Sequence, residues 1–237
     1  MPRKYHEKQI ADEFVEYYHN DFNPETFYRR TGFFNKSGVS FEGRPYTEIY
    51  SELILKYSIL DRLADIKCIC IKNSYNPPTH AIHTVNKGTN QKEKTCAKGL
   101  LQKEFEEFGR VIGFEIPLRN DRKGGNIDLL SYNKKTNSAY VLELKKPGSK
   151  ETLLRCAIEA YTYSKRVHHY KLRNDYNLPD DCSIIPAALV FEGSIAANEY
   201  FDIKHRPFLD ELLMRMNVKT FVIRVNDIPA EYLELSK

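Results

Sequence analysis

The sequence predicts an α/β fold in which helices flank a mixed central sheet, with a mainly helical N-terminal extension before it. Residues 95–237 alternate between helical and strand-like apolar patterns, as expected of helices packed on a sheet. Residues 1–94 show mostly helical spacing. The stretch 73–94 contains Pro77-Pro78 and many Asn, Lys and Thr residues. This composition indicates a loop and places the expected boundary between extension and core after residue 94.

The overall composition is that of a chain able to bury a core. Hydrophobic residues make up 41% and charged residues 29% of the sequence, which argues against a disordered chain. The net charge of +4 permits a nucleic-acid partner without requiring one. No apolar run has membrane-spanning length and no signal peptide opens the sequence, so we expect a cytoplasmic protein without a membrane partner. The five scattered cysteines fit reduced thiols better than disulfides.

The N-terminal extension is expected to contain two helices and one strand. Apolar residues recur at helical spacing over residues 7–22 and 47–60, and an apolar run over 66–71 predicts a strand. Such an extension is a candidate recognition or dimerisation element, which leaves a homodimer open.

The core is expected to begin with a helix capped by Thr95 and to continue with three strands. Pro147-Gly148 ends the third strand, and Ser149 can cap the helix that follows. A buried strand, a helix and a last strand complete the chain. In order, the predicted elements are a helix over 97–112, strands over 114–118, 124–130 and 140–146, a helix over 149–167, a strand over 183–191, a helix over 207–216 and a strand over 218–225.

Three charged residues lie on the second and third predicted strands of the core. Asp128 belongs to one strand, and Glu143 and Lys145 belong to the other. Because side chains alternate along a strand, Glu143 and Lys145 share one face and Leu144 points to the opposite face. Charged side chains on apolar strands are unfavourable unless they are paired or bound to a metal ion. These residues are therefore candidates for a site, and a structural ion pair across two strands is the alternative.

The three residues are chemically suited to metal-assisted hydrolysis of phosphodiesters. Two carboxylates that converge from adjacent strands offer Mg²⁺ the oxygen ligands it prefers, and the backbone carbonyl of Leu144 can add another. Lys145 can orient a water molecule or neutralise charge that builds on a phosphate in the transition state. We therefore expect Asp128 and Glu143 to bind Mg²⁺, with Mn²⁺ as a substitute.

On these residues the sequence resembles the PD-(D/E)XK nuclease superfamily, whose restriction-endonuclease-like core has the element order αβββαβ. Asp128 matches the first acid of the motif, Glu143 the second acid and Lys145 the lysine, and the resemblance covers residues 95–192. No proline precedes Asp128, which departs from the family pattern. The resemblance implies a Mg²⁺-dependent endonuclease acting on DNA. A non-catalytic nucleic-acid-binding or scaffold protein with the same fold is the alternative.

The resemblance also implies further site residues. Many members carry a glutamate on the first core helix that reaches the metal ion, and Glu104 takes this place as a catalytic residue and metal ligand, with Glu107 as the fallback. RecB-type members carry Gln-x-x-x-Tyr on the helix after the lysine strand, where this chain has Glu159 and Tyr163. We expect both residues to support the site, although glutamate replaces glutamine. A solvated surface acid and ordinary helix packing are the alternatives.

Basic residues near the predicted site are candidate nucleic-acid contacts, because Lys and Arg bind phosphate backbones. A solvated helix end is the alternative for the basic run at 165–173, since cations also suit a helix C-terminus. Two other pairs, His80 with His83 and Cys68 with Cys70, lack the spacing of a structural zinc site. The candidate nucleic-acid-binding residues are Arg119, Arg122, Lys123, Lys146, Lys165 and Arg166.

Overall fold

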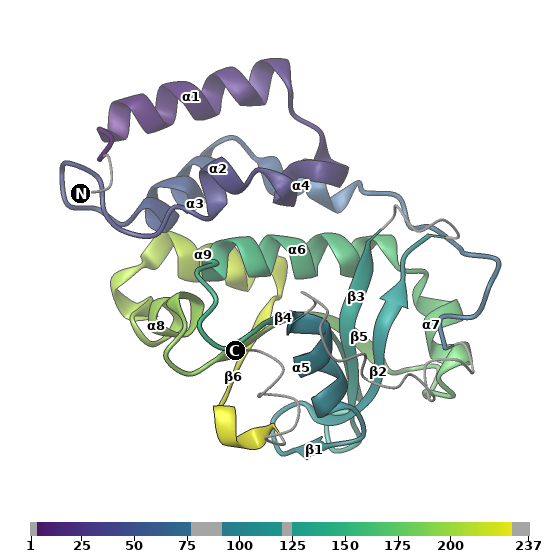
Figure 1. Cartoon of the computed structure of the whole chain (residues 1–237). Helices are drawn as coiled ribbons and strands as arrows, with labels where there is room; N and C mark the ends of the chain where they lie inside the picture. The colour runs from purple at the N-terminus through teal and green to yellow at the C-terminus, as the bar shows by residue number, and fades with distance from the viewer. Residues whose placement is uncertain (1–3, 77–91, 120–124, 229–237) are drawn as a thin grey trace.

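A mixed sheet of six strands lies at the centre of the computed structural model, which describes residues 4–76, 92–119 and 125–228 (Figure 1). The strands follow the order β1-β2-β3-β4-β5-β6, antiparallel from β1 to β4 and parallel from β4 to β6. The predicted α/β class with a mixed sheet is therefore confirmed. The strands are β1 Glu104–Phe105, β2 Gly109–Pro117, β3 Asn126–Asn133, β4 Ser138–Lys145, β5 Ser183–Phe191 and β6 Lys219–Ile223.

Helices cover both faces of this sheet (Figure 1). Within the described residues, no helix is long and apolar enough to cross a membrane. The α-helices are α1 Glu7–Asn20, α2 Thr31–Phe34, α3 Tyr46–Lys56, α4 Ile59–Ala64, α5 Lys92–Leu100, α6 Leu153–Arg166, α7 His169–Asp175, α8 Ile195–Phe201 and α9 Pro207–Met216, and the 3-10 helices are η1 Pro24–Arg29, η3 Ile203–His205 and η4 Val225–Asp227.

The helix α6 lies between the sheet and the N-terminal helices (Figure 1). Thr152 caps it by accepting a hydrogen bond from the backbone N–H of Arg155 at 3.2 Å. Its side chains Leu154 and Ile158 belong to one buried cluster that extends from the sheet to Phe14 on α1. Burial of such a side chain contributes about 1.5–3 kcal/mol. One apolar core thus joins the N-terminal helices to the face of the sheet on which α6 lies.

The opposite face of the sheet packs against α5. Cys96, Ala97 and Leu100 from this helix form a second buried cluster with residues such as Leu142 and Leu144 of β4. Since Leu142 and Leu144 point to α5, the alternate residues of the same strand point to α6. The sheet register therefore decides that Glu143 and Lys145 face α6.

The predicted helix over 97–112 is wrong beyond Leu100, so only its first four residues are helical. The helix α5 ends at Leu100, and the chain then forms β1 and β2. Gly109 has a φ of +76°, and a Cβ atom there would lie 2.2 Å from the carbonyl oxygen of Tyr132. The apolar spacing of this stretch combines a helix end with a strand, and it resembles one long helix by coincidence.

Other predicted elements agree more closely with the structure. The strand at 183–191 and the helix at 207–216 coincide with β5 and α9. The segment over 66–71 forms no strand, and instead Ile69 makes a single parallel bridge to Val167.

Candidate active site

The site is built where β3 and β4 begin to separate. The last backbone pair between them joins Leu129 to Leu142, and one step further this register places Asp128 opposite Glu143. There the N–H of Leu144 donates a hydrogen bond to the Asp128 carboxylate (Oδ2) at 2.8 Å. A side chain thus replaces a backbone acceptor and fixes one carboxylate beside the other.

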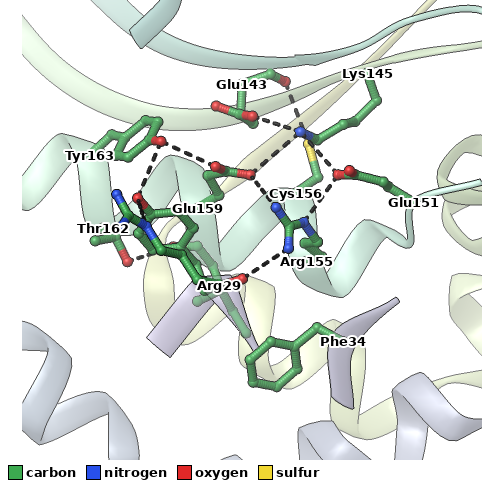
Figure 2. Close-up of polar contacts among 12 residues, drawn as sticks. Arg29, Phe34, Glu143, Lys145, Glu151, Arg155, Cys156, Glu159, Thr162 and Tyr163 are labelled. Carbon is green, nitrogen blue, oxygen red and sulfur yellow. Dashed lines mark hydrogen bonds and ion pairs between the residues drawn. The ribbon is translucent and has the colours of Figure 1, made fainter. Parts of the chain in front are cut away.

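Lys145 is the centre of the ion-pair network in Figure 2. Its ammonium (Nζ) lies 2.7 Å from Glu143 Oε1, 3.1 Å from Glu151 Oε2 and 3.4 Å from Glu159 Oε2. Lys145 is 3% exposed and Glu143 is 4% exposed. Burial opposes the charge of Lys145, but the carboxylates of Glu143 and Glu159 raise its pKa well above the usual value. The lysine is therefore held in its charged form.

Two side chains of α6, together with Glu151 just before its N-cap, arrange the outer part of this network. Arg155 lies one turn from both Glu151 and Glu159, with Nε 3.1 Å from the first and Nη2 3.7 Å from the second. Such i,i+4 pairs stabilise a helix and hold long side chains in place. Glu151 and Glu159 are thereby positioned to contact Lys145 as well as Arg155.

Among the residues that the structure describes, the site contains more carboxylates than cations. The carboxylates are those of Asp128, Glu143, Glu151 and Glu159, and the cations that contact them are Lys145 and Arg155. Burial, followed by the negative charge of Asp128, raises the pKa of Glu143 well above its usual range. Burial also raises the pKa of Asp128 to about 7. A further cation at this position would relieve the repulsion between the two carboxylates.

A divalent metal ion fits the residues at this position. The Oε2 atom of Glu143 is buried and accepts no hydrogen bond from any described residue, so it is available to bind a cation. Among the residues that the structure describes, no group of three or more His, Cys, Asp and Glu side chains is arranged to hold a metal ion. Mg²⁺ is commonly bound by one or two carboxylates together with water and substrate oxygens. Asp128 and Glu143, with the carbonyl of Leu144 in the same strand, meet that requirement.

The structure brings Glu159 and Tyr163 to the site, as the sequence indicated. The Tyr163 hydroxyl donates a hydrogen bond to Glu159 Oε1 at 3.1 Å, and the other oxygen of Glu159 contacts Lys145. Burial raises the pKa of Tyr163 well above its usual value, so its hydroxyl stays protonated. Gly125, with a φ of +79°, passes so close that a Cβ atom would lie 3.1 Å from the Tyr163 hydroxyl. The start of β3 therefore lies against this tyrosine.

The prediction for Glu104 is wrong. Glu104 lies on the short strand β1, and it pairs there with Arg110, which pairs in turn with Tyr132 near the far end of β3 from Asp128. Its side chain is exposed, and so is that of the fallback, Glu107. Neither reaches the site, because the helix that was expected to carry them ends before residue 104. On α5, it is Glu93 whose negative charge, after burial and together with that of Glu159, helps to raise the pKa of Asp128.

The basic residues predicted to contact nucleic acid differ in their exposure to solvent. The prediction that Arg166 contacts nucleic acid is wrong, because this residue is 4% exposed and its guanidinium lies 4.0 Å from Glu25. Lys165 is half-buried and lies over the ring of Tyr161 at 5.2 Å. The remaining positions do not contradict a role in binding. Lys146 is half-buried, Arg119 is exposed, and Arg122 and Lys123 lie outside the described residues, as do His80 and His83.

Sequence reasoning missed four residues of the network. Glu151 and Arg155 precede Glu159 at intervals of four, and this alternating charge pattern could have revealed them. Tyr28 and Arg29 come from η1 in the N-terminal region, and no local pattern indicates that they reach α6. Only the tertiary fold brings them there.

Comparisons of the chain with known proteins identify no relative. No protein-family model, no curated protein and no solved structure matches it. The class of protein must therefore be inferred from the site itself.

Proposed function

We propose that this protein is a Mg²⁺-dependent endonuclease with a restriction-endonuclease-like core, and that DNA is its substrate. One observation carries the proposal. Asp128 and Glu143 oppose each other on neighbouring strands, with a charged lysine beside Glu143 on the same face and a buried Glu143 oxygen (Oε2) that no described residue hydrogen-bonds. Each part matches the chemistry that phosphodiester hydrolysis needs. DNA as the substrate rests on the resemblance of the motif to PD-(D/E)XK nucleases.

Each residue has a distinct role in this proposal. Asp128 and Glu143 would hold the metal ion, and the carbonyl of Leu144 could add a ligand. When bound there, Mg²⁺ would polarise the phosphate and favour ionisation of a water molecule. Lys145 is protonated, so its ammonium would donate hydrogen bonds to the attacking water or to a phosphate oxygen and would stabilise developing negative charge. Glu159 keeps Lys145 charged and aligned, and Tyr163 orients Glu159.

The rival proposal is a non-catalytic nucleic-acid-binding or scaffold protein. It has support in the same network, because Glu143 and Lys145 already form a buried ion pair at 2.7 Å. Such a pair can specify a fold without any reaction. The excess of carboxylates favours the metal-dependent enzyme, since a structural ion pair would need only one carboxylate for each cation.

A cleavage assay with matched variants separates the two. Supercoiled plasmid is incubated with Mg²⁺ and wild-type protein, Asp128→Asn, Lys145→Met or Glu104→Gln. We expect nicking by the wild-type protein and by Glu104→Gln, which changes an exposed acid far from the site. In Asp128→Asn and Lys145→Met the cleavage rate should fall by at least about 100-fold, which is the order of the loss when one oxyanion-stabilising donor is removed. Equal cleavage by all four proteins would contradict the assignment. Binding of DNA without cleavage by any of them would favour the non-catalytic module.

A further inference from the structure

The N-terminal region reaches the active site through η1. The buried ring of Tyr28 packs edge-on against Tyr163, with ring centroids 5.4 Å apart. On another side, Arg155 donates a hydrogen bond from Nη1 to the carbonyl oxygen of Tyr28 at 3.2 Å. These contacts hold η1 against α6 beside the carboxylate network, and they orient the next residue, Arg29.

A chain of polar contacts leads from Lys145 to Arg29. Lys145 contacts Glu159 at 3.4 Å, and Glu159 accepts a hydrogen bond from Tyr163 at 3.1 Å. The hydroxyl of Tyr163 lies 3.4 Å from that of Tyr28. At the outer end, Arg29 Nε donates to the Tyr28 hydroxyl at 2.9 Å. Figure 2 shows Arg29 beside Tyr163 and Glu159, on the side of α6 that faces the N-terminal region of the chain.

Arg29 differs from the two cations inside the network. Lys145 and Arg155 are enclosed and already paired with carboxylates. Arg29 is exposed, and its hydrogen bond to Tyr28 uses Nε. The planar guanidinium has five N–H groups in a fork that matches two oxygens of a phosphate. A guanidinium anchored through one nitrogen, with its other end towards solvent, is pre-organised to bind such a group.

A polyanionic substrate needs a cation at this point. The described network carries two more carboxylates than cations, so a bound Mg²⁺ would only balance its charge, and attraction of a DNA backbone requires further positive charge at its rim. Arg29 supplies that charge at the outer end of the chain that leads to Lys145. Both the position and the charge of Arg29 therefore suit the binding of a DNA phosphate at the rim of the site.

We propose that Arg29 binds a backbone phosphate of DNA beside the reacting phosphodiester, so that the N-terminal region contributes directly to the substrate site. This inference rests on the proposed nuclease function. It makes Arg29 a substrate-binding residue and assigns to η1 a role within the active site. The extension is then part of the nuclease unit itself.

Arg30 provides a matched control in the adjacent position. It is exposed as well, but its guanidinium lies 4.4 Å over the ring of Tyr17 on α1. The two arginines thus share charge, exposure and sequence context, and they differ in the partner that orients them. A general effect of charge would be equal at both positions.

The test measures DNA affinity as a function of salt. Full-length protein carrying Asp128→Asn, which keeps the DNA intact, is titrated against fluorescently labelled duplex and single-stranded DNA at several KCl concentrations. For added Arg29→Gln we expect about tenfold weaker binding and a slope of log K against log salt that is smaller by about 0.9, as for the loss of one phosphate contact. Arg30→Gln should leave both quantities unchanged. Arg29→Lys should keep the slope, since the charge remains.

Tyr28→Phe separates binding from a structural role of Arg29. It removes the hydroxyl that anchors the guanidinium and keeps the positive charge, so the slope should stay the same. The proposal is overturned if Arg29→Gln binds DNA like its parent, or if its affinity falls with an unchanged slope and a lowered melting temperature. If the parent protein binds neither duplex nor single-stranded DNA, the nuclease proposal fails together with this one. Parent binding with an inert Arg29→Gln refutes the role of Arg29 alone.

Discussion

Removal of the negative charge at Asp128 is expected to stabilise the metal-free protein at pH 8. Asp128 must ionise there in a buried position, where the negative charges of Glu93 and Glu159 also oppose ionisation. An amide at this position can still accept the hydrogen bond from the N–H of Leu144. Asp128→Asn therefore removes the cost of a buried negative charge and keeps the local geometry.

The pKa of Asp128 sets the size and the sign of this effect. Burial raises it from 3.8 to about 7, and a difference of roughly 3 in pKa corresponds to at most about 4 kcal/mol. Because the folded-state pKa lies above the unfolded one, the stabilising contribution is complete below pH 3.8 and is lost as the pH rises through about 7. The wild-type protein should therefore lose more stability between pH 5 and pH 8 than Asp128→Asn does.

Urea unfolding in EDTA at pH 5 and pH 8 measures this difference, with Glu104→Gln as the control for a lost surface charge. Mg²⁺ at 100 times its dissociation constant should then restore about 2.7 kcal/mol to the wild-type protein at pH 8 and nothing to Asp128→Asn. The reasoning is refuted if Asp128→Asn is less stable than the wild-type protein in EDTA at pH 8, or if Mg²⁺ stabilises both equally.

Three further predictions concern other parts of the site. Glu143→Gln should weaken Mn²⁺ binding at least tenfold in calorimetry, since it replaces the unsatisfied carboxylate oxygen, and unchanged affinity would exclude Glu143 as a ligand. Tyr163→Phe should lower stability in urea by about 1–3 kcal/mol, because buried Glu159 loses a donor; an unaltered midpoint would show that this bond contributes nothing. Gly125→Ala should be more destabilising than Gly148→Ala, because Gly148 shares the positive φ but has no atom of the described residues within 4 Å of the added Cβ. The cost of Gly125→Ala should exceed the roughly 1–2 kcal/mol of the backbone conformation alone. Equal melting temperatures for the two alanine variants would rule out crowding against Tyr163.

The parts of the site that local patterns encode were predictable. A period of two places Glu143 and Lys145 on one face of a strand whatever surrounds it, and the polar hairpin after β3 fixes which strand lies beside them. Glu159 and Tyr163 were also predictable, because a helix places residues four apart on one side. Local periodicity is sufficient where the element itself is correctly assigned.

The positions of Glu104 and Arg29 could not be predicted from local periodicity. The apolar residues after Leu100 fit a helical period, but the close approach of Gly109 to Tyr132 belongs to a strand, and no local pattern reveals that approach. Arg29 is more than 100 residues from Lys145 in sequence, and its place depends on the packing of η1 against α6. Long-range packing decides both positions, and a single sequence carries no direct signal of it.

The central claim is that Asp128 and Glu143 together hold a divalent cation beside Lys145. A crystal structure of the protein with Mn²⁺, recorded at a wavelength where manganese scatters anomalously, tests this claim most directly. We predict an anomalous peak within about 2.5 Å of a carboxylate oxygen of both residues, near the upper end of oxygen–cation ligand distances. The absence of such a peak at millimolar Mn²⁺, with Glu143 still paired only to Lys145, would contradict the account.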